Sequence, residues 1–186
     1  MKEKQFYQNI QKVLENLPEN FSILEEQIDI EVQMKYFDYV QKNRTDEVSA
    51  ECFANRDDLF SENTDFERKK EILVNIATID DVKAFRTIEK FVKESSGEIY
   101  QWAVLALQES RMLLQSSLLD EQQVFISTGL GGRGQKLRYF VVLRSKNLQV
   151  EFTKVQKQLV ESELIFIIKR YDGVFEEIEF EEGFAK

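Results

Sequence analysis

Residues 80–110 read DDVKAFRTIEKFVKESSGEIYQWAVLALQES, and they carry two apolar patterns at helical spacing. The first pattern places three side chains on one face, namely Phe85, Ile88 and Val92. Ser96-Gly97-Glu98 then interrupts the chain and offers a new helix start. The second pattern is broad and rich in Ala and Leu, and its members are Ile99, Trp102, Ala103, Ala106, Leu107, Leu113 and Leu114. Because the link between the two patterns is short, this stretch predicts two antiparallel helices packed on each other.

Helix signals continue on the N-terminal side of this stretch. Thr45 is placed to cap a helix whose apolar side chains are Val48, Cys52, Phe53, Leu59 and Phe60. Thr64-Asp-Phe-Glu67 has the spacing of a capping box, and the helix after it is expected to turn three side chains inward: Leu73, Ile76 and Ala77. A further start is expected at Thr78-Ile-Asp-Asp81, just before the opening stretch.

The first 43 residues are also predicted to be largely helical. Residues 2–17 place five apolar side chains on one helical face, and this face ends at Leu17-Pro18. Residues 20–43 allow two interpretations, because residues 27–34 alternate like a strand while the spacing from Ile30 to Val40 fits a helix. We favour the helix, since the surroundings lack glycine and are rich in Glu, Gln and Lys.

The pair of predicted helices in 80–110 resembles one hairpin of the HEAT repeat family. Its second helix carries WAVLAL where that family places an Ala- and Leu-rich inward face. Residues from about 46 to 78 resemble a second, degenerate unit. The resemblance implies stacked helical hairpins with an extended binding surface, and an ordinary helical bundle is the alternative.

The composition of the chain changes near residue 119. VFIST (124–128) and LRYFVVLR (137–144) are rich in β-branched and aromatic residues, and they bracket a run of glycines as in a β-hairpin. The second of these segments is apolar on both faces in its middle, which is typical of a central strand.

Beyond the two strands we expect a helix over residues 149–170, a third strand at VFEEIEF (174–180) and a turn at EEGF. The helix would turn Phe152, Val155, Leu159 and Phe166 inward. LIFII (164–168) also fits a strand, but the Glu/Lys/Gln-rich run before it favours helix. The sequence therefore predicts an α+β fold, in which an antiparallel α-helical region (1–118) precedes a small α+β region (119–186) with a glycine-rich β-hairpin.

The glycine run GLGGRGQK (129–136) has the spacing G-x-G-x-x-G of a dinucleotide-binding loop. In that fold the third glycine opens a helix, whereas QKLRYFVVL follows here and is typical of a strand. A Walker A loop fits less well still, because Gln135 and Lys136 occupy the wrong positions and no Ser or Thr is available for Mg²⁺.

Charge gives the same segment a second interpretation. Residues 122–150 hold five basic residues and no Asp or Glu, although the chain has a net charge of -9. Glycine amides beside basic side chains suit a phosphate or carboxylate. The candidate anion or partner site is Gly129, Gly131, Gly132, Arg133, Gly134, Lys136 and Arg138. The alternative is structural: glycines supply positive φ in a turn, basic residues protect strand edges, and the acidic segment 172–182 neutralises the bases across a sheet.

The composition excludes several chemistries. The chain has no His and a single cysteine, Cys52, so it has no His-based catalytic pair, no His-ligated metal and no intrachain thiolate zinc site. We expect no catalytic residues, no cofactor and no metal. The lone cysteine favours a cytoplasmic location, the acidic charge disfavours nucleic acid, and the longest apolar run is too short to span a membrane.

These observations lead to two hypotheses of function. The first is a non-enzymatic protein-interaction protein, an adaptor or regulatory subunit, with a protein partner or a second copy of itself. The alternative is a domain that recognises an anion or a nucleotide through the glycine-rich basic hairpin 129–138.

Overall fold

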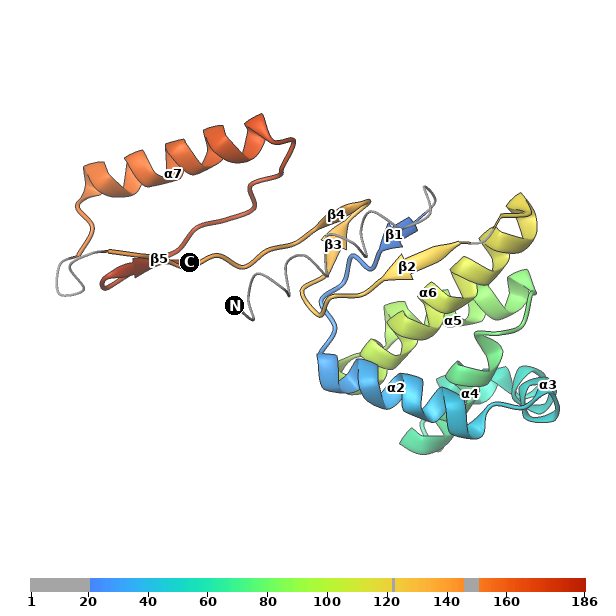
Figure 1. Cartoon of the computed structure of the whole chain (residues 1–186). Coiled ribbons are helices and arrows are strands. Elements are labelled where there is room, and N and C mark those ends of the chain that lie inside the picture. The colour runs from blue at the N-terminus through green and yellow to red at the C-terminus, as the bar shows by residue number, and fades with distance from the viewer. Residues whose placement is uncertain (1–20, 122, 146–150) are drawn as a thin grey trace, which may run out of the picture. The chain divides into compact units, whose positions relative to one another are not determined.

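The computed structural model describes residues 21–121, 123–145 and 151–186 (Figure 1). Two compact units share the chain: the first ends at Leu137 and the second runs from Arg138 to Lys186. Helices dominate the first unit, one short strand precedes them and further short strands follow, so the predicted α+β fold with an N-terminal helical region is confirmed. The helix predicted over residues 2–17 lies outside the described residues, as does Lys146.

The first unit contains five α-helices and one 3-10 helix within the described residues. They are α2 (Ile30–Asn43), α3 (Asp46–Ala54), η1 (Arg56–Phe60), α4 (Phe66–Ile76), α5 (Val82–Glu94) and α6 (Gly97–Leu119). The interpretation of residues 20–43 as helix is therefore confirmed from Ile30 onward.

The helix starts follow the capping rules. The Thr45 hydroxyl accepts a hydrogen bond from the Val48 amide at 3.3 Å, as predicted for the start of α3. At the start of α4 the prediction was wrong by one residue, because the cap is Asp65 and not Thr64. The Asp65 carboxylate accepts from the Arg68 amide at 2.8 Å, and its charge also interacts favourably with the helix dipole.

The opening stretch of sequence forms the predicted pair of helices. Ser95 and Ser96 separate α5 from α6, and Gly97 takes the left-handed conformation with φ 67°, which lets the chain reverse. α5 packs on α6, while α3 packs on α4 and α4 packs on α6. The first unit is thus organised as two successive helix pairs.

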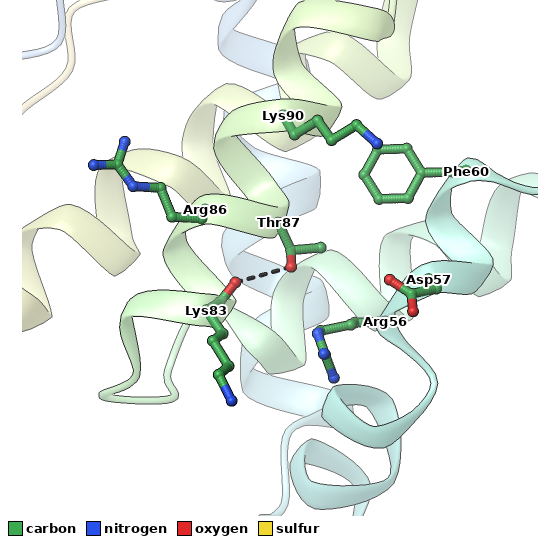
Figure 2. A pocket seen from close by; sticks show the side chains of 7 residues that line it. All are labelled: Arg56, Asp57, Phe60, Lys83, Arg86, Thr87 and Lys90. Carbon is green, nitrogen blue, oxygen red and sulfur yellow. Dashed lines mark hydrogen bonds between the residues drawn. The ribbon is translucent and has the colours of Figure 1, made fainter.

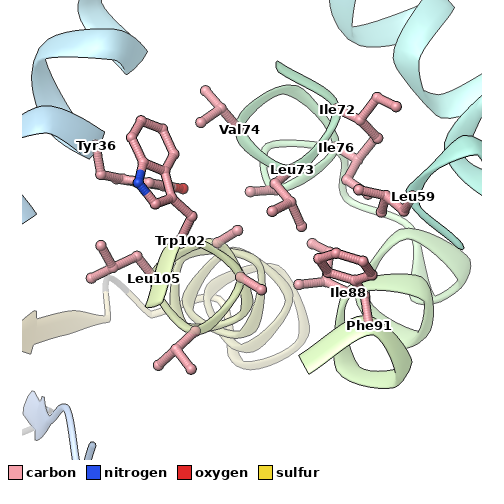
Figure 3. Close-up of a cluster of buried hydrophobic side chains, with 14 of the residues drawn as sticks. Tyr36, Leu59, Ile72, Leu73, Val74, Ile76, Ile88, Phe91, Trp102 and Leu105 are labelled. Atoms are coloured by element: carbon pink, nitrogen blue, oxygen red, sulfur yellow. The ribbon is translucent and has the colours of Figure 1, made fainter. Parts of the chain in front are cut away.

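Trp102 lies at the centre of the core of the first unit (Figure 3). Its ring meets the rings of Tyr36 and Tyr39 edge-on, with centroids 5.4 and 5.6 Å away. From the other helices, Leu73 of α4 and Ile88 of α5 are fully buried in the same cluster. Removing a buried side chain of this size costs about 3–5 kcal/mol of stability, so this cluster is a main source of the stability of the first unit.

Two small sheets complete the first unit. β1 (Phe21–Ile23) pairs with β2 (Val124–Ile126) in parallel, and β3 (Gly132–Arg133) pairs with β4 (Lys136–Leu137) antiparallel. The strand predicted at VFIST is therefore present, but its predicted pairing with LRYFVVLR is wrong. The physical reason is that β1, which the sequence did not reveal, takes the edge of β2 and leaves the glycine run to fold on itself.

The second unit holds β5 (Leu143–Arg144), α7 (Lys154–Arg170), β6 (Phe180–Glu181) and β7 (Phe184–Ala185). The three strands form one antiparallel sheet in the order β5-β7-β6. Gly183, with φ 78°, makes the predicted turn at EEGF. LIFII lies within α7, which confirms the helical interpretation of 164–168.

Three predictions for the second unit are wrong. Residues 138–142 and 174–179 lie in no strand, because β5 and β6 are only two residues long. The helix begins at Lys154 and not at residue 149. Its expected inward side chains Val155, Leu159 and Phe166 are exposed, since the three short strands of this unit offer no layer wide enough to cover them.

Candidate functional site

The glycine run predicted as a binding site forms a tight hairpin. Gly132 is opposite Leu137 and Arg133 is opposite Lys136, so Gly134-Gln135 make the turn. Gly134 has φ 60°, a conformation that glycine reaches without steric cost. The structure therefore brings the predicted residues Gly129 to Lys136 together in the first unit.

Groups of the first unit already use the backbone of this hairpin. The Gly132 amide donates to the Glu25 carbonyl at 3.3 Å, and the Gly134 amide donates to Glu25 Oε1 at 3.4 Å. In turn the Gly134 carbonyl accepts from the Ile23 amide at 3.1 Å. Two of the amides expected to cradle an anion thus have acceptors, and the Glu25 carboxylate repels a second negative charge placed at the turn.

Close packing explains two of the glycines. A Cβ on Gly132 would lie 2.5 Å from Ile23 Cγ2 and 2.6 Å from the Lys136 carbonyl oxygen. A Cβ on Gly129 would lie 2.7 Å from Ile30 Cγ1. These glycines let the hairpin approach β1 and the start of α2 more closely than any side chain permits.

The basic residues of the predicted site fall into different environments. Arg133 and Lys136 are exposed on the hairpin, while Arg138 belongs to the second unit. There its guanidinium holds Glu176 through two hydrogen bonds of 2.8 and 3.0 Å. The acidic segment 172–182 thus supplies a partner for Arg138, but not across a sheet as expected, because neither residue lies in a strand.

The single cysteine is buried beside charged groups. The Cys52 side chain is fully buried, with Arg68 Nη1 3.8 Å from its sulfur. Burial raises the pKa of the Cys52 thiol to about 12. The thiol is therefore protonated at neutral pH, which makes it a poor nucleophile.

The second unit exposes an unusual amount of apolar surface. Helix α7 has 17 residues and none of them is buried. Val155, Leu159 and Phe166 are 73%, 59% and 63% exposed. In the extended segment before β5 the side chains of residues 139–142, Tyr-Phe-Val-Val, are all at least half exposed. Single exposed apolar side chains are ordinary, but such a concentration of them is unusual on a protein surface.

A second feature, which the sequence did not reveal, is an open groove between η1 and α5 (Figure 2). It has a volume of about 320 Å³, and we call it the basic groove. Its lining consists of Arg56, Asp57, Phe60, Lys83, Arg86, Thr87 and Lys90. The spacing of Lys83, Arg86 and Lys90 indicates a basic stretch on one helix, but no pattern in the sequence predicts that Arg56 lies close to them.

Several contacts hold the lining of the basic groove in place. Arg56 donates to the Phe53 carbonyl at 2.9 Å, and Arg86 donates to Glu89 at 2.6 Å. The Lys90 ammonium lies 4.4 Å from the centre of the Phe60 ring. The Thr87 hydroxyl donates to the Lys83 carbonyl, one turn earlier in α5. The groove therefore has a defined shape with cations along its rim.

Among residues 21–121, 123–145 and 151–186, no three Cys, Asp or Glu side chains gather in a way that would hold a metal ion. Over the same described residues, no helix combines the length and the apolar character needed to cross a membrane.

Comparison of the chain with protein-family models, with curated proteins and with solved structures gave no match. Function is therefore inferred from the residues of the chain itself.

Proposed function

We propose that this chain is a non-enzymatic protein-interaction protein, of the adaptor or regulatory kind, which binds a partner protein through α7. One observation carries the proposal: eight of the 17 residues of α7 are Val, Leu, Ile or Phe, and none is buried. A helix that is apolar around most of its circumference is normally covered by other protein. The covering molecule is the partner.

The exposed residues of α7 form a continuous surface. Val155, Leu159 and Phe166 follow one another at spacings of four and seven residues, so they share one face of the helix. We call these three residues the α7 stripe. A stripe of this kind binds best to another amphipathic helix or to a groove that accepts one.

The helix is well formed without the partner. At its start the Thr153 hydroxyl and the Gln156 side chain make a reciprocal capping box. At its end Lys169 and Arg170 complement the helix dipole. Little ordering entropy is therefore lost from α7 when the partner binds.

Charge indicates the chemistry of the partner. Both ends of α7 are basic, with Lys154 and Lys157 at the start and Lys169 and Arg170 at the end. A second α7, parallel or antiparallel, would bring basic ends against basic ends. We therefore propose a partner helix with an apolar stripe between acidic ends, and not a second copy of this chain.

The expected affinity is modest. Burying Val, Leu and Phe contributes roughly 1.5–3 kcal/mol per side chain. Association costs about 4–15 kcal/mol, so the stripe needs the help of the charged ends. We therefore expect weak, reversible binding.

The first unit is proposed as the scaffold of this protein. Its helix pairs α3–α4 and α5–α6, which contact each other through α4 and α6, support the resemblance to HEAT-type hairpins. The single buried thiol of Cys52 supports a cytoplasmic location. By contrast, the anion-recognition hypothesis for 129–138 gains no support from the hairpin, because Glu25 holds two of its amides.

The experiment uses two fluorescent 18-residue helical peptides with identical leucine stripes, one with glutamate ends and one with lysine ends. Fluorescence anisotropy with the full chain should show binding of the glutamate peptide only. The triple variant Val155→Ser/Leu159→Ser/Phe166→Ser should weaken that binding at least about tenfold. Raising the salt concentration from 50 to 500 mM should also weaken it, because salt screens the attraction between exposed charges.

A matched control distinguishes the stripe from exposed apolar residues in general. Met34→Ser/Leu118→Ser/Leu119→Ser removes three side chains of similar exposure from the first unit, 68%, 81% and 59%, and should leave binding unchanged. The proposal is wrong if neither peptide binds, if the lysine peptide binds equally well, or if light scattering shows that α7 instead joins two copies of the chain.

A further inference from the structure

We propose that the basic groove between η1 and α5 is a second binding site, which takes an extended acidic peptide segment. This site goes beyond the proposed function of α7, because it lies in the first unit and depends on different residues. Four of the seven lining residues are cations and one, Asp57, is an anion, in a chain of net charge -9. Such a local reversal of charge attracts and orients an acidic ligand.

The cations come from two elements that are far apart in the sequence. Lys83, Arg86 and Lys90 recur along α5, and Arg56 approaches from the start of η1; the Arg86 side chain extends away from Phe60 (Figure 2). The core holds these two elements together, because Leu59 of η1 and Ile88 of α5 are both fully buried in the same cluster. Packing therefore fixes the two elements that carry the four cations before any ligand binds.

The cations keep hydrogen-bond donors for a ligand. An arginine side chain has five N–H donors, and the contacts described for Arg56 and Arg86 use only part of each guanidinium. The Lys83 ammonium makes no ion pair or hydrogen bond with any residue that the structure describes. Glu89 and Glu94 already pair with Arg86 at 2.6 Å and with Lys90 at 3.9 Å, so an acidic ligand would bind chiefly to Arg56 and Lys83 and to the donors that Arg86 and Lys90 keep.

The spread of the cations indicates an extended ligand and not a single small anion. From Lys83 to Lys90 the helix rises about 10 Å, at 1.5 Å per residue. A single phosphate reaches one or two of these side chains. In an extended peptide, side chains on one face recur about every 6.5–7 Å, so alternate carboxylates reach successive cations along α5.

Phe60 gives the groove a partly apolar wall. Its ring packs edge-on against Phe91, with centroids 5.8 Å apart, and carries the Lys90 ammonium on its face. A wall of this kind suits the Cα and Cβ atoms of a peptide backbone. It offers no aromatic platform for a series of stacked bases, which single-stranded nucleic acid would use.

The test is fluorescence anisotropy of the full chain with a labelled peptide of four Glu-Ser repeats. A peptide of four Gln-Ser repeats, a single-stranded oligonucleotide of eight thymidines and inorganic phosphate as competitor serve as comparisons. We expect the glutamate peptide to bind and the glutamine peptide not to bind. Lys83→Gln/Arg86→Gln/Lys90→Gln should weaken glutamate-peptide binding at least about tenfold.

The control variant removes the same charge elsewhere: Lys35→Gln/Lys42→Gln/Arg133→Gln changes three exposed cations outside the groove, one of them on the glycine hairpin. It should bind the peptide as the unchanged protein does. Equal weakening by the two variants would overturn the proposal. The same holds if both peptides bind alike, if neither binds, or if the oligonucleotide binds as tightly as the glutamate peptide.

The two proposals fail independently. The groove variant should still bind the glutamate-ended helical peptide through α7, while the stripe variant should still bind the Glu-Ser peptide. Loss of both activities in the groove variant alone would assign all acidic binding to the groove and contradict the function proposed for α7.

Discussion

The guanidinium of Arg44 donates two hydrogen bonds to the carboxylate of Glu109, of 2.8 Å from Nη1 and 2.9 Å from Nη2. Arg44 follows directly after α2, and Glu109 lies in the middle of α6. The same Nη2 also donates to the Val74 carbonyl of α4 at 2.7 Å, and the Tyr36 hydroxyl donates to Glu109 Oε2 at 2.7 Å. Three helices of the first unit are therefore tied together by one charged, mostly buried pair.

Replacement of this pair should destabilise the protein. Arg44→Ala leaves the Glu109 carboxylate partly buried without its cation, which we expect to cost about 1.5–3 kcal/mol. The melting temperature measured by circular dichroism should fall by several degrees. Lys42→Ala is the control, because the ion pair between Lys42 and Asp38 is exposed and lies within α2. This variant should cost well under about 1 kcal/mol. Equal losses in the two variants would show that Arg44 does not tie the helices together.

Tyr36 should make the stability of the first unit sensitive to alkaline pH. Burial, followed by the charge of Glu109, raises the pKa of Tyr36 well above its usual value. The folded state thus favours the neutral phenol, so this contribution to stability is complete below about pH 10 and is lost as the pH rises through the raised pKa. The free energy of unfolding, measured by urea titration, should fall less steeply above pH 10 in Tyr36→Phe than in the unchanged protein.

Ionisation of Cys52 also destabilises the folded state at alkaline pH, because burial raises the pKa of this thiol to about 12. Tyr36→Phe should therefore still lose some stability as the pH rises. If Tyr36→Phe and the unchanged protein have parallel curves above pH 10, the phenol is not buried against Glu109 as described.

The thiol of Cys52 should react slowly in the folded protein. At pH 8 the thiolate population is about a thousandfold below that of an ordinary cysteine with a pKa near 8.5. Alkylation by iodoacetamide, followed by mass spectrometry, should be complete within minutes in 6 M urea and far slower in native buffer. A Ser117→Cys control in a Cys52→Ala background places a thiol on the exposed end of α6; it should react quickly without urea. Fast native labelling of Cys52 would contradict its burial.

Two glycines of the hairpin should respond differently to alanine. Gly132→Ala forces its Cβ against Ile23 and against the Lys136 carbonyl, so the hairpin must move away from β1. Gly134→Ala meets nothing within 4 Å and has only the cost of its left-handed φ, about 1–2 kcal/mol.

Hydrogen exchange measures this difference directly. The Ile23 amide, which donates to the Gly134 carbonyl, should lose most of its protection in Gly132→Ala and keep more of it in Gly134→Ala. The reverse order of protection would show that the hairpin does not pack on β1 through Gly132.

The helices of the first unit could be predicted from the sequence, since local signals determine them. Caps such as Thr45, the break at Gly97 and the Ala-rich pattern around Trp102 each act within a few residues. The strand β1 could not be predicted, because it is three residues long and exists through pairing with β2, about a hundred positions away. Because the pairing of β1 with β2 could not be predicted, the sequence instead predicted a long hairpin in which the glycine run joins 124–128 to 137–144.

The candidate sites show the same limit. The prediction for 129–138 followed from local glycines and bases, and it missed Glu25, which reaches the hairpin from a distant part of the chain. The basic groove depends on Arg56 meeting α5 through the packing of Leu59, which no sequence pattern expresses. In the second unit, the period of α7 correctly predicted a helix, but periodicity does not reveal whether the unit provides anything to cover the apolar face.

The function proposed for this chain depends on the binding of an acidic, amphipathic partner to the α7 stripe. The most direct measurement is photo-crosslinking in the native cell, with benzoylphenylalanine in place of Leu159 and, as the control, in place of Met34, followed by sequencing of the crosslinked peptide. Our account predicts an adduct from position 159 alone, in which the attached peptide is an amphipathic segment with acidic ends. Adducts that form equally from both positions, that join two copies of this chain, or that carry a basic segment would contradict it.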